Sequence, residues 1–138
     1  MKQEDKDLLL RDLCARLPYE VKIQYEDNIF TIDYISAMYE EIKLNTSNRY
    51  TIDVLEVKPY LFPLSSMTEE HREEFLNIQT EERQILLNAL IEYKSGKYDK
   101  IPIIAPYKQI EWLNKNHFDY RGLIEKGLAI DATGLNIY

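Results

Sequence analysis

The sequence predicts an α+β fold, with an N-terminal helix, a small and mostly antiparallel sheet, and a helical C-terminal half that covers the sheet. Leucines recur at four-residue spacing near the start of the chain, which is typical of a helix. Apolar and polar residues then alternate within residues 20–57, which is typical of strands. Helical patterns dominate after residue 64, so strands precede helices instead of alternating with them. This order favours α+β over α/β.

The 138 residues fit the usual size of one domain, and we predict a single domain over 1–138. Its expected parts are a helix and sheet over 1–57, a helical part over 64–130 and a loose tail over 131–138. The first helix is expected over residues 4–17, because Leu9, Leu13 and Leu17 lie on one face. Pro18 should end it.

Two strands joined by a tight turn are expected next. Residues 20–26 alternate in polarity, Asp27-Asn28 favours a turn, and the alternation resumes at Phe30, Ile32 and Tyr34. Residues 36–44 fit a strand or a short helix equally well, so this segment stays open.

The last strand of the sheet is expected over residues 50–57. Apolar residues occur on both of its faces, which indicates an internal strand. Pro59 and Pro63 argue against a ladder over Lys58–Pro63, so we expect an extended connector that leaves the sheet.

The C-terminal half should be mainly helical. Ser66 and Glu69 have the spacing of a capping box, and 68–95 should form one broken helix or two consecutive helices, with a second cap at Thr80. The apolar segment IPIIAP over 101–106 should link this region to a further helix over 107–116. We then expect a turn over 116–120, a short helix over 121–126 and a short strand or extended segment over 128–130.

Composition restricts the classes of function and the compartment. The net charge of −7 argues against non-specific nucleic-acid binding and against docking on an anionic membrane. One cysteine, Cys14, excludes an internal disulfide and a multi-cysteine zinc site, and we expect it to be a small core residue. The N-terminus is too acidic for a signal peptide, and no apolar stretch is long enough to span a membrane. We therefore expect a cytoplasmic protein.

Three blocks of the sequence resemble a known family. They read DLLLRDLCARLPY over 7–19, VKPYLFPLSSMTEEHREEF over 57–75 and IEWLNKNHFDYRGLIEKGLAI over 110–130. Together they cover about 50 of the 138 residues and resemble a family of short bacterial proteins of unknown function, associated with prophages and mobile elements. The resemblance implies an accessory role in such an element. It implies no activity, cofactor or catalytic residue.

No set of residues in the sequence predicts catalysis, a cofactor or a metal. The chain has no glycine-rich phosphate loop and no nucleophile elbow. His71 lies among glutamates at a helix start, which is typical of a surface histidine. His117 and Asp119 could supply two metal ligands, but a divalent site needs three or four. A helix cap explains Asp119 more simply.

Residues 107–130 allow two interpretations. Two helices joined by a turn and followed by Gly-Leu-Ala-Ile resemble a helix-turn-helix, in which Tyr120 and Arg121 would begin the recognition helix. A packed helical hairpin has the same pattern, and the acidic charge and the short second helix favour it over DNA binding.

A second set of candidate binding residues is aromatic. Lys58, Tyr60, Phe62 and Trp112 could form a surface of aromatic anchors with one cation. Alternatively, Leu61, Phe62 and Trp112 could fill the core between the sheet and the C-terminal helices. We therefore expect an interaction protein that binds a protein or a small ligand and is not an enzyme. The alternative is a DNA-binding regulator that uses residues 107–130. Binding candidates are Lys58, Tyr60, Phe62, Trp112, His117, Tyr120 and Arg121.

Overall fold

The computed structural model of the chain describes residues 3–46, 50–78 and 107–138. They belong to two compact units. The first, which we call the sheet unit, comprises Met1–Ser66 and Leu113–Tyr138. The second, the inserted unit, is Met67–Trp112. The described elements confirm the predicted α+β class, with an N-terminal helix, a mostly antiparallel sheet and a later helix.

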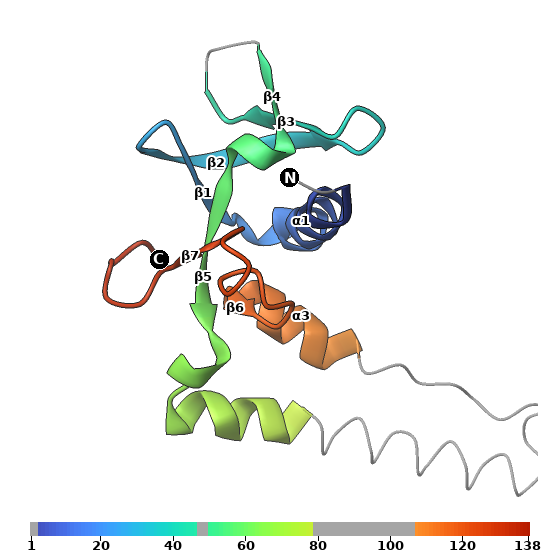
Figure 1. Cartoon of the computed structure of the whole chain (residues 1–138). Coiled ribbons are helices and arrows are strands. Elements are labelled where there is room, and N and C mark those ends of the chain that lie inside the picture. The colour runs from blue at the N-terminus through green and yellow to red at the C-terminus, as the bar shows by residue number, and fades with distance from the viewer. Residues whose placement is uncertain (1–2, 47–49, 79–106) are drawn as a thin grey trace, which may run out of the picture. The chain divides into compact units, whose positions relative to one another are not determined.

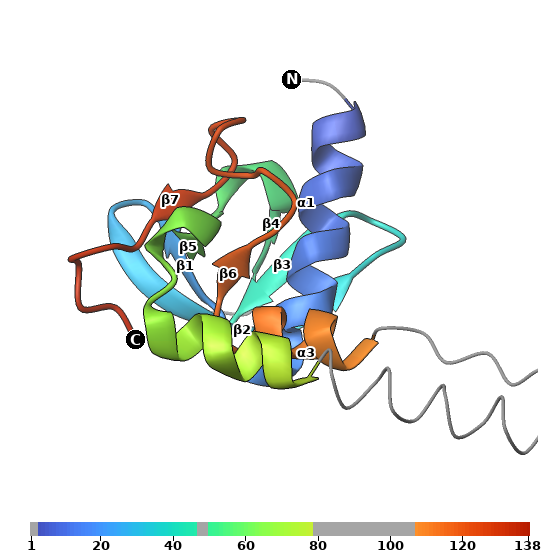
Figure 2. The same ribbon diagram turned by 90° about the horizontal axis from the view of Figure 1, so that it is seen from below.

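The first helix forms as predicted. Helix α1 spans Gln3–Arg16, and Leu9 and Leu13 are buried on its inner side. The 3-10 turn η1, Leu17–Tyr19, follows it with Pro18 at its start. Cys14 is exposed, so its expected place in the core is wrong. Figures 1 and 2 show α1 beside the strands of the sheet.

Within the described residues, seven strands form the sheet in the order β4-β3-β2-β1-β5-β6, with β7 also paired to β5. Strands β1 to β4 pair antiparallel in sequence order, and β1 also pairs antiparallel with β5. Strand β5 pairs parallel with β6 and β7. The bounds are β1 Lys22–Tyr25, β2 Asn28–Ser36, β3 Glu41–Leu44, β4 Thr51–Asp53, β5 Lys58–Pro63, β6 Phe118–Asp119 and β7 Ile130–Asp131.

The predicted hairpin is confirmed, with two local corrections. Its turn residues are Glu26 and Asp27, both with positive φ, one position before the expected turn. A bulge lies between Ile32 and Tyr34 and changes which side chains face the core. Tyr34 is therefore exposed, and Ile35 packs against the core instead. The open segment 36–44 is a turn followed by strand β3.

The internal strand predicted over 50–57 is wrong. Strand β4 ends at Asp53 and lies at an edge of the sheet. The Asp53 side chain accepts a hydrogen bond from the amide of Leu55, and the Glu56 side chain accepts one from the amide of Asp53. This capping box begins the 3-10 turn η2, Val54–Glu56, and ends the strand.

The connector predicted over 58–63 is also wrong, because this segment is β5, a strand with neighbours on both sides. Its two prolines are the second and the last residues of the strand, so the amides between them stay available. The Phe62 amide donates to the His117 carbonyl at 2.8 Å, and the Leu61 carbonyl accepts from the Ala132 amide at 2.8 Å.

The 3-10 turn η3, Leu64–Ser66, follows β5, and residues 69–78 are helical. Thr68, not Ser66, caps this helix. Its hydroxyl accepts from the His71 amide, and His71 Nδ1 accepts from the Thr68 amide, both at 3.2 Å. The Ser66 hydroxyl instead donates to the Pro63 carbonyl. The rest of the predicted helix over 68–95, the cap at Thr80 and the IPIIAP segment lie outside the described residues.

The later helix is confirmed as α3, Tyr107–Lys115. The predicted turn over 116–120 contains β6, and the predicted strand over 128–130 is realised as β7. The short helix predicted over 121–126 is wrong, since residues 123–127 form turns. The described residues therefore lack the second helix of the helix-turn-helix interpretation.

The hydrophobic core lies in the sheet unit and joins distant parts of the sequence. Helix α1, strands β1, β3 and β5, turn η2 and the segment after β6 all contribute to it. Its buried members are Leu9, Leu13, Val21, Ile23, Ile42, Leu44, Val54, Val57, Leu61, Leu123, Leu128 and Ala129. The residues that follow β6 are thus part of the same core as α1.

Candidate functional site

Two charged residues of α1 are completely buried in the sheet unit. Asp12 and Arg16 lie one helical turn apart, and Arg16 Nε donates to Asp12 Oδ2 at 2.8 Å. Arg16 Nη2 also donates to the carbonyl oxygen of Phe118 in β6 at 2.6 Å. Burying charges is costly unless they are paired and hydrogen-bonded, as these are. The pair therefore fastens α1 to the short strand β6.

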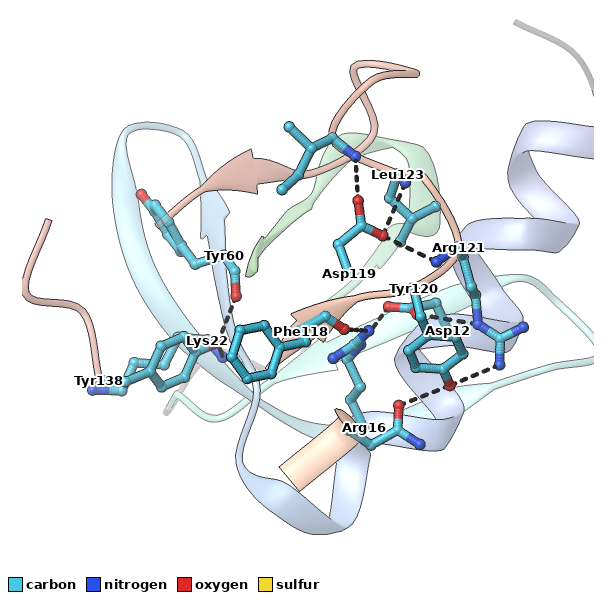
Figure 3. A network of polar contacts seen from close by, with 12 residues as sticks. Asp12, Arg16, Lys22, Tyr60, Phe118, Asp119, Tyr120, Arg121, Leu123 and Tyr138 are labelled. Atoms are coloured by element: carbon cyan, nitrogen blue, oxygen red, sulfur yellow. Dashed lines mark hydrogen bonds and ion pairs between the residues drawn. The ribbon is translucent and has the colours of Figure 1, made fainter. Parts of the chain in front are cut away.

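A second guanidinium shares the same carboxylate. Arg121 Nε donates to Asp12 Oδ1 at 3.2 Å, so Asp12 bridges two arginines (Figure 3). The ring of Tyr120 lies between them, with its centroid 5.4 Å from Cζ of Arg16 and 4.9 Å from Cζ of Arg121. The Tyr120 hydroxyl accepts from Arg121 Nη2 and donates to Asn114 Oδ1.

The buried carboxylate of Asp119 organises the backbone that follows it. It accepts hydrogen bonds from the amides of Arg121 at 3.3 Å, Leu123 at 3.0 Å and Ile124 at 3.0 Å. Gly122 lies within this turn at φ +74°, a conformation that favours glycine. Asp119 is thus a cap, as proposed from the sequence, but it caps a turn and not a helix.

An aromatic cluster lies beside this network. The ring of Tyr138 stacks on His117 at 3.6 Å and also contacts Phe62, with ring centroids 5.9 Å apart. The Tyr138 hydroxyl accepts from the Lys22 amide at 2.9 Å and donates to the Tyr60 carbonyl at 2.8 Å (Figure 3). The end of the segment predicted as a loose tail therefore makes specific contacts with β1 and β5.

Burial controls the ionisation of this cluster. Burial, aided by the positive charges of Arg16 and Lys22, lowers the pKa of His117 to about 4. Burial also raises the pKa of Tyr138 to about 12, against the opposing effects of the Lys22 amide and Arg16. Both rings are therefore neutral near pH 7.

A cavity of about 330 Å³ opens next to the Asp119 turn. This volume is within the range of small-molecule sites, about 300–1,000 Å³. Its walls come from the end of β5, from η3 and from the turn after β6. The lining residues are Pro63, Leu64, Ser65, Asp119, Tyr120, Gly122, Ile124 and Glu125. Polar and apolar groups contribute to the lining in similar measure, and its two charged members are acidic.

The sheet unit contains six of the seven sequence-predicted candidates. They lie on or beside β5 and β6, and they are Lys58, Tyr60, Phe62, His117, Tyr120 and Arg121. Among these six only Tyr120 lines the cavity, while Tyr60 is buried.

Lys58 is exposed at the start of β5. Trp112 belongs to the inserted unit, where its ring contacts His71 and Phe75 and its Nε1 donates to Glu74 at 3.1 Å.

Sequence reasoning missed Asp12, Arg16, Lys22 and Tyr138. A signal was present for the first two, since an aspartate and an arginine at i, i+4 flank the buried Leu13 of an apolar helix face. No comparable signal marks Lys22 or Tyr138, because their contact joins residues 116 positions apart.

Comparison of the chain with models of protein families, with curated proteins and with solved structures finds no match. Within the described ranges, no cluster of three histidine, cysteine or carboxylate side chains could hold a metal ion. In the same ranges, no helix combines the length and the apolar character needed to cross a membrane.

Proposed function

We propose that the protein is a non-enzymatic binding protein that takes a small, partly apolar ligand in the cavity beside Asp119. The cavity is the observation that carries this proposal, because its volume lies in the range of small-molecule sites and its lining offers both polar and apolar groups. The resemblance found in the sequence adds the proposal of an accessory role in a prophage or mobile element.

The polar groups of the lining support binding over catalysis. The Asp119 carboxylate is engaged by three backbone amides, and the Tyr120 hydroxyl is engaged by Arg121 and Asn114. Because both groups are held by hydrogen bonds within the protein, their role is to form the wall of the cavity. Glu125 is the exposed acid of the lining, so we expect a neutral or cationic ligand that donates hydrogen bonds.

Saturation-transfer NMR tests this proposal with a set of small aromatic amines, their neutral isosteres and their carboxylate counterparts. We expect amines and neutral fragments to bind the full chain, and carboxylates not to bind. Ser65→Trp should abolish binding, because Ser65 is an exposed residue of the lining and a large ring there would fill the cavity.

Leu135→Trp is the matched control, since Leu135 is exposed and lies outside the lining. Equal binding of the fragments to the wild type and to Ser65→Trp would refute the cavity as the site, and so would a set in which no fragment binds.

DNA binding, the alternative from the sequence, stays a prediction. The helix that was to carry Tyr120 and Arg121 into a groove is replaced by turns, and Arg121 is engaged with Asp12. The geometry therefore gives no observation that favours it.

A further inference from the structure

The turn between β2 and β3 exposes large apolar side chains. Met38 is 84% exposed and Tyr39 70%, and both lie in the turn over residues 37–40. Tyr34, on the adjoining part of β2, is 50% exposed because the bulge turns it outward. We call Tyr34, Met38 and Tyr39 the hairpin tip. Figure 1 shows this loop extending from the sheet beside α1.

The composition of the hairpin tip is unusual for its position. Turns favour glycine, proline, asparagine, aspartate and serine, and each of these residues has a conformational reason to be there. The sequence here is Ala-Met-Tyr-Glu. Methionine and tyrosine are the adaptable and amphipathic residues that protein interfaces favour. The turn chemistry therefore gives no reason for these side chains, whereas a partner surface would.

The hairpin tip is held in place by α1. Glu40, which ends the turn, has a left-handed φ of 55° and is fixed by two side chains of the helix. Gln3 Nε2 donates to Glu40 Oε1 at 3.0 Å, and Lys6 Nζ pairs with Glu40 Oε2 at 3.1 Å. The Glu40 carbonyl also accepts from the Val54 amide at 3.0 Å. A partner would therefore meet an ordered turn, which lowers the entropy lost on binding.

Negative charge surrounds the hairpin tip. The first turns of α1 and the hairpin, residues 3–7 and 33–41, contain one cation, Lys6, which is engaged by Glu40 and Asp53. The same two segments contain six carboxylates, Glu4, Asp5, Asp7, Asp33, Glu40 and Glu41. A second copy of the chain would bring like charges together here, whereas a basic partner would be attracted.

We propose that the hairpin tip docks a basic segment of another protein, through apolar or aromatic anchors that contact Met38 and Tyr39. Carboxylates around the tip would attract the basic side chains and speed association, and the apolar contacts would hold the complex. This site is distinct from the cavity, so the two proposals can fail independently.

Fluorescence anisotropy tests the proposal with labelled twelve-residue peptides and the full chain. The probe peptide alternates lysine and arginine with leucine and tryptophan. A second peptide replaces its cations with glutamate, and a third replaces its apolar residues with serine. We expect the first peptide to bind, with an affinity that falls as salt is raised, and the other two to bind at least about tenfold more weakly.

Two variants locate the contact. Met38→Ser with Tyr39→Ser should weaken binding of the probe at least about tenfold, as loss of central anchors does. Ile29→Ser is the matched control, because Ile29 is an exposed apolar residue, 50% exposed, at the other end of β2. The affinity of this variant for the probe peptide should equal that of the wild type. Circular dichroism should show that both variants fold, as expected for exposed positions.

Three results would overturn the proposal. The first is equal affinity of the hairpin-tip variant and the wild type, and the second is equal binding of the glutamate peptide. The third is self-association of the wild type, seen by analytical ultracentrifugation, that the hairpin-tip variant abolishes, because it would make a second copy the occupant.

Discussion

Asp12 is a completely buried carboxylate that serves two arginines at once. Its two oxygens accept from Arg16 at 2.8 Å and from Arg121 at 3.2 Å. Removing one partner of a buried ion pair is costly because an uncompensated charge stays buried. The same carboxylate also positions the guanidinium groups on either side of the Tyr120 ring. It therefore affects both the stability of the sheet unit and the wall of the cavity.

Asp12→Ala should lower the free energy of unfolding by about 3–5 kcal/mol, because it leaves Arg16 buried without its counter-ion. Urea unfolding followed by circular dichroism measures this change. Lys6→Ala removes an ion pair near the surface, between Lys6 and the carboxylates of Glu40 and Asp53, and should cost clearly less. Similar decreases in the free energy of unfolding for the two variants would show that the buried pair stabilises the fold no more than the pair near the surface.

His117 should make stability depend on pH. Its pKa is about 4 in the folded protein and near 6.5 when unfolded, so the unfolded chain binds more protons between these values. The contribution of His117 to the free energy of unfolding is therefore complete above pH 6.5 and is lost as the pH falls toward 4. His117→Asn removes the titration and tolerates the left-handed φ of 62°.

The urea midpoints of both proteins, measured from pH 7 to pH 4, test this effect. The urea midpoint of the wild type should fall more than that of His117→Asn over this interval. Titration of the carboxylates changes both midpoints alike, so it does not contribute to the difference. Parallel curves would show that His117 titrates normally in the folded protein.

Strand β5 shows how an element can form against its local sequence preference. Its prolines remove amides only at the second and last positions. Lys58 and Pro59 pair with β1, and the residues between the prolines pair with β6 and β7. Local reasoning treats each proline as a strand breaker. Whether a proline is tolerated depends on which amide the neighbouring strand requires, and that is a property of the assembled sheet.

The turn between β1 and β2 contains two residues that are not the ones its backbone conformation favours. Glu26 at φ 46° and Asp27 at φ 63° both have a left-handed backbone, and two-residue hairpin turns of this kind prefer Asn-Gly. Each residue held in such a backbone conformation raises the free energy of the folded state by up to about 1–3 kcal/mol.

Replacing Glu26 with asparagine and Asp27 with glycine should therefore raise the free energy of unfolding by about 1 kcal/mol. The urea midpoint measures the gain. Glu26→Pro is the opposite control, because proline fixes φ near −65° and should destabilise the hairpin. A loss of stability in the Asn-Gly variant would mean that the native side chains make contacts that outweigh the strain.

At the scale of the whole molecule, the sequence predicts elements better than it predicts how they meet. The α+β class, α1, the first hairpin and α3 follow from periodicity and turn chemistry, which are local. The edge position of β4 and the pairing of β5 depend on long-range partners, so local patterns missed them. For the candidate site the same limit holds, since Arg121 was singled out but its partner Asp12 lies 109 positions away.

The late completion of the sheet has a consequence for synthesis of the protein. Strand β5 is translated well before β6 and β7, which pair with its residues 60–63. Until β6 and β7 leave the ribosome, the backbone groups of β5 that pair with them are unpaired and can pair with other chains. A nascent chain that ends between residues 63 and 118 should therefore be more prone to aggregation than the full chain.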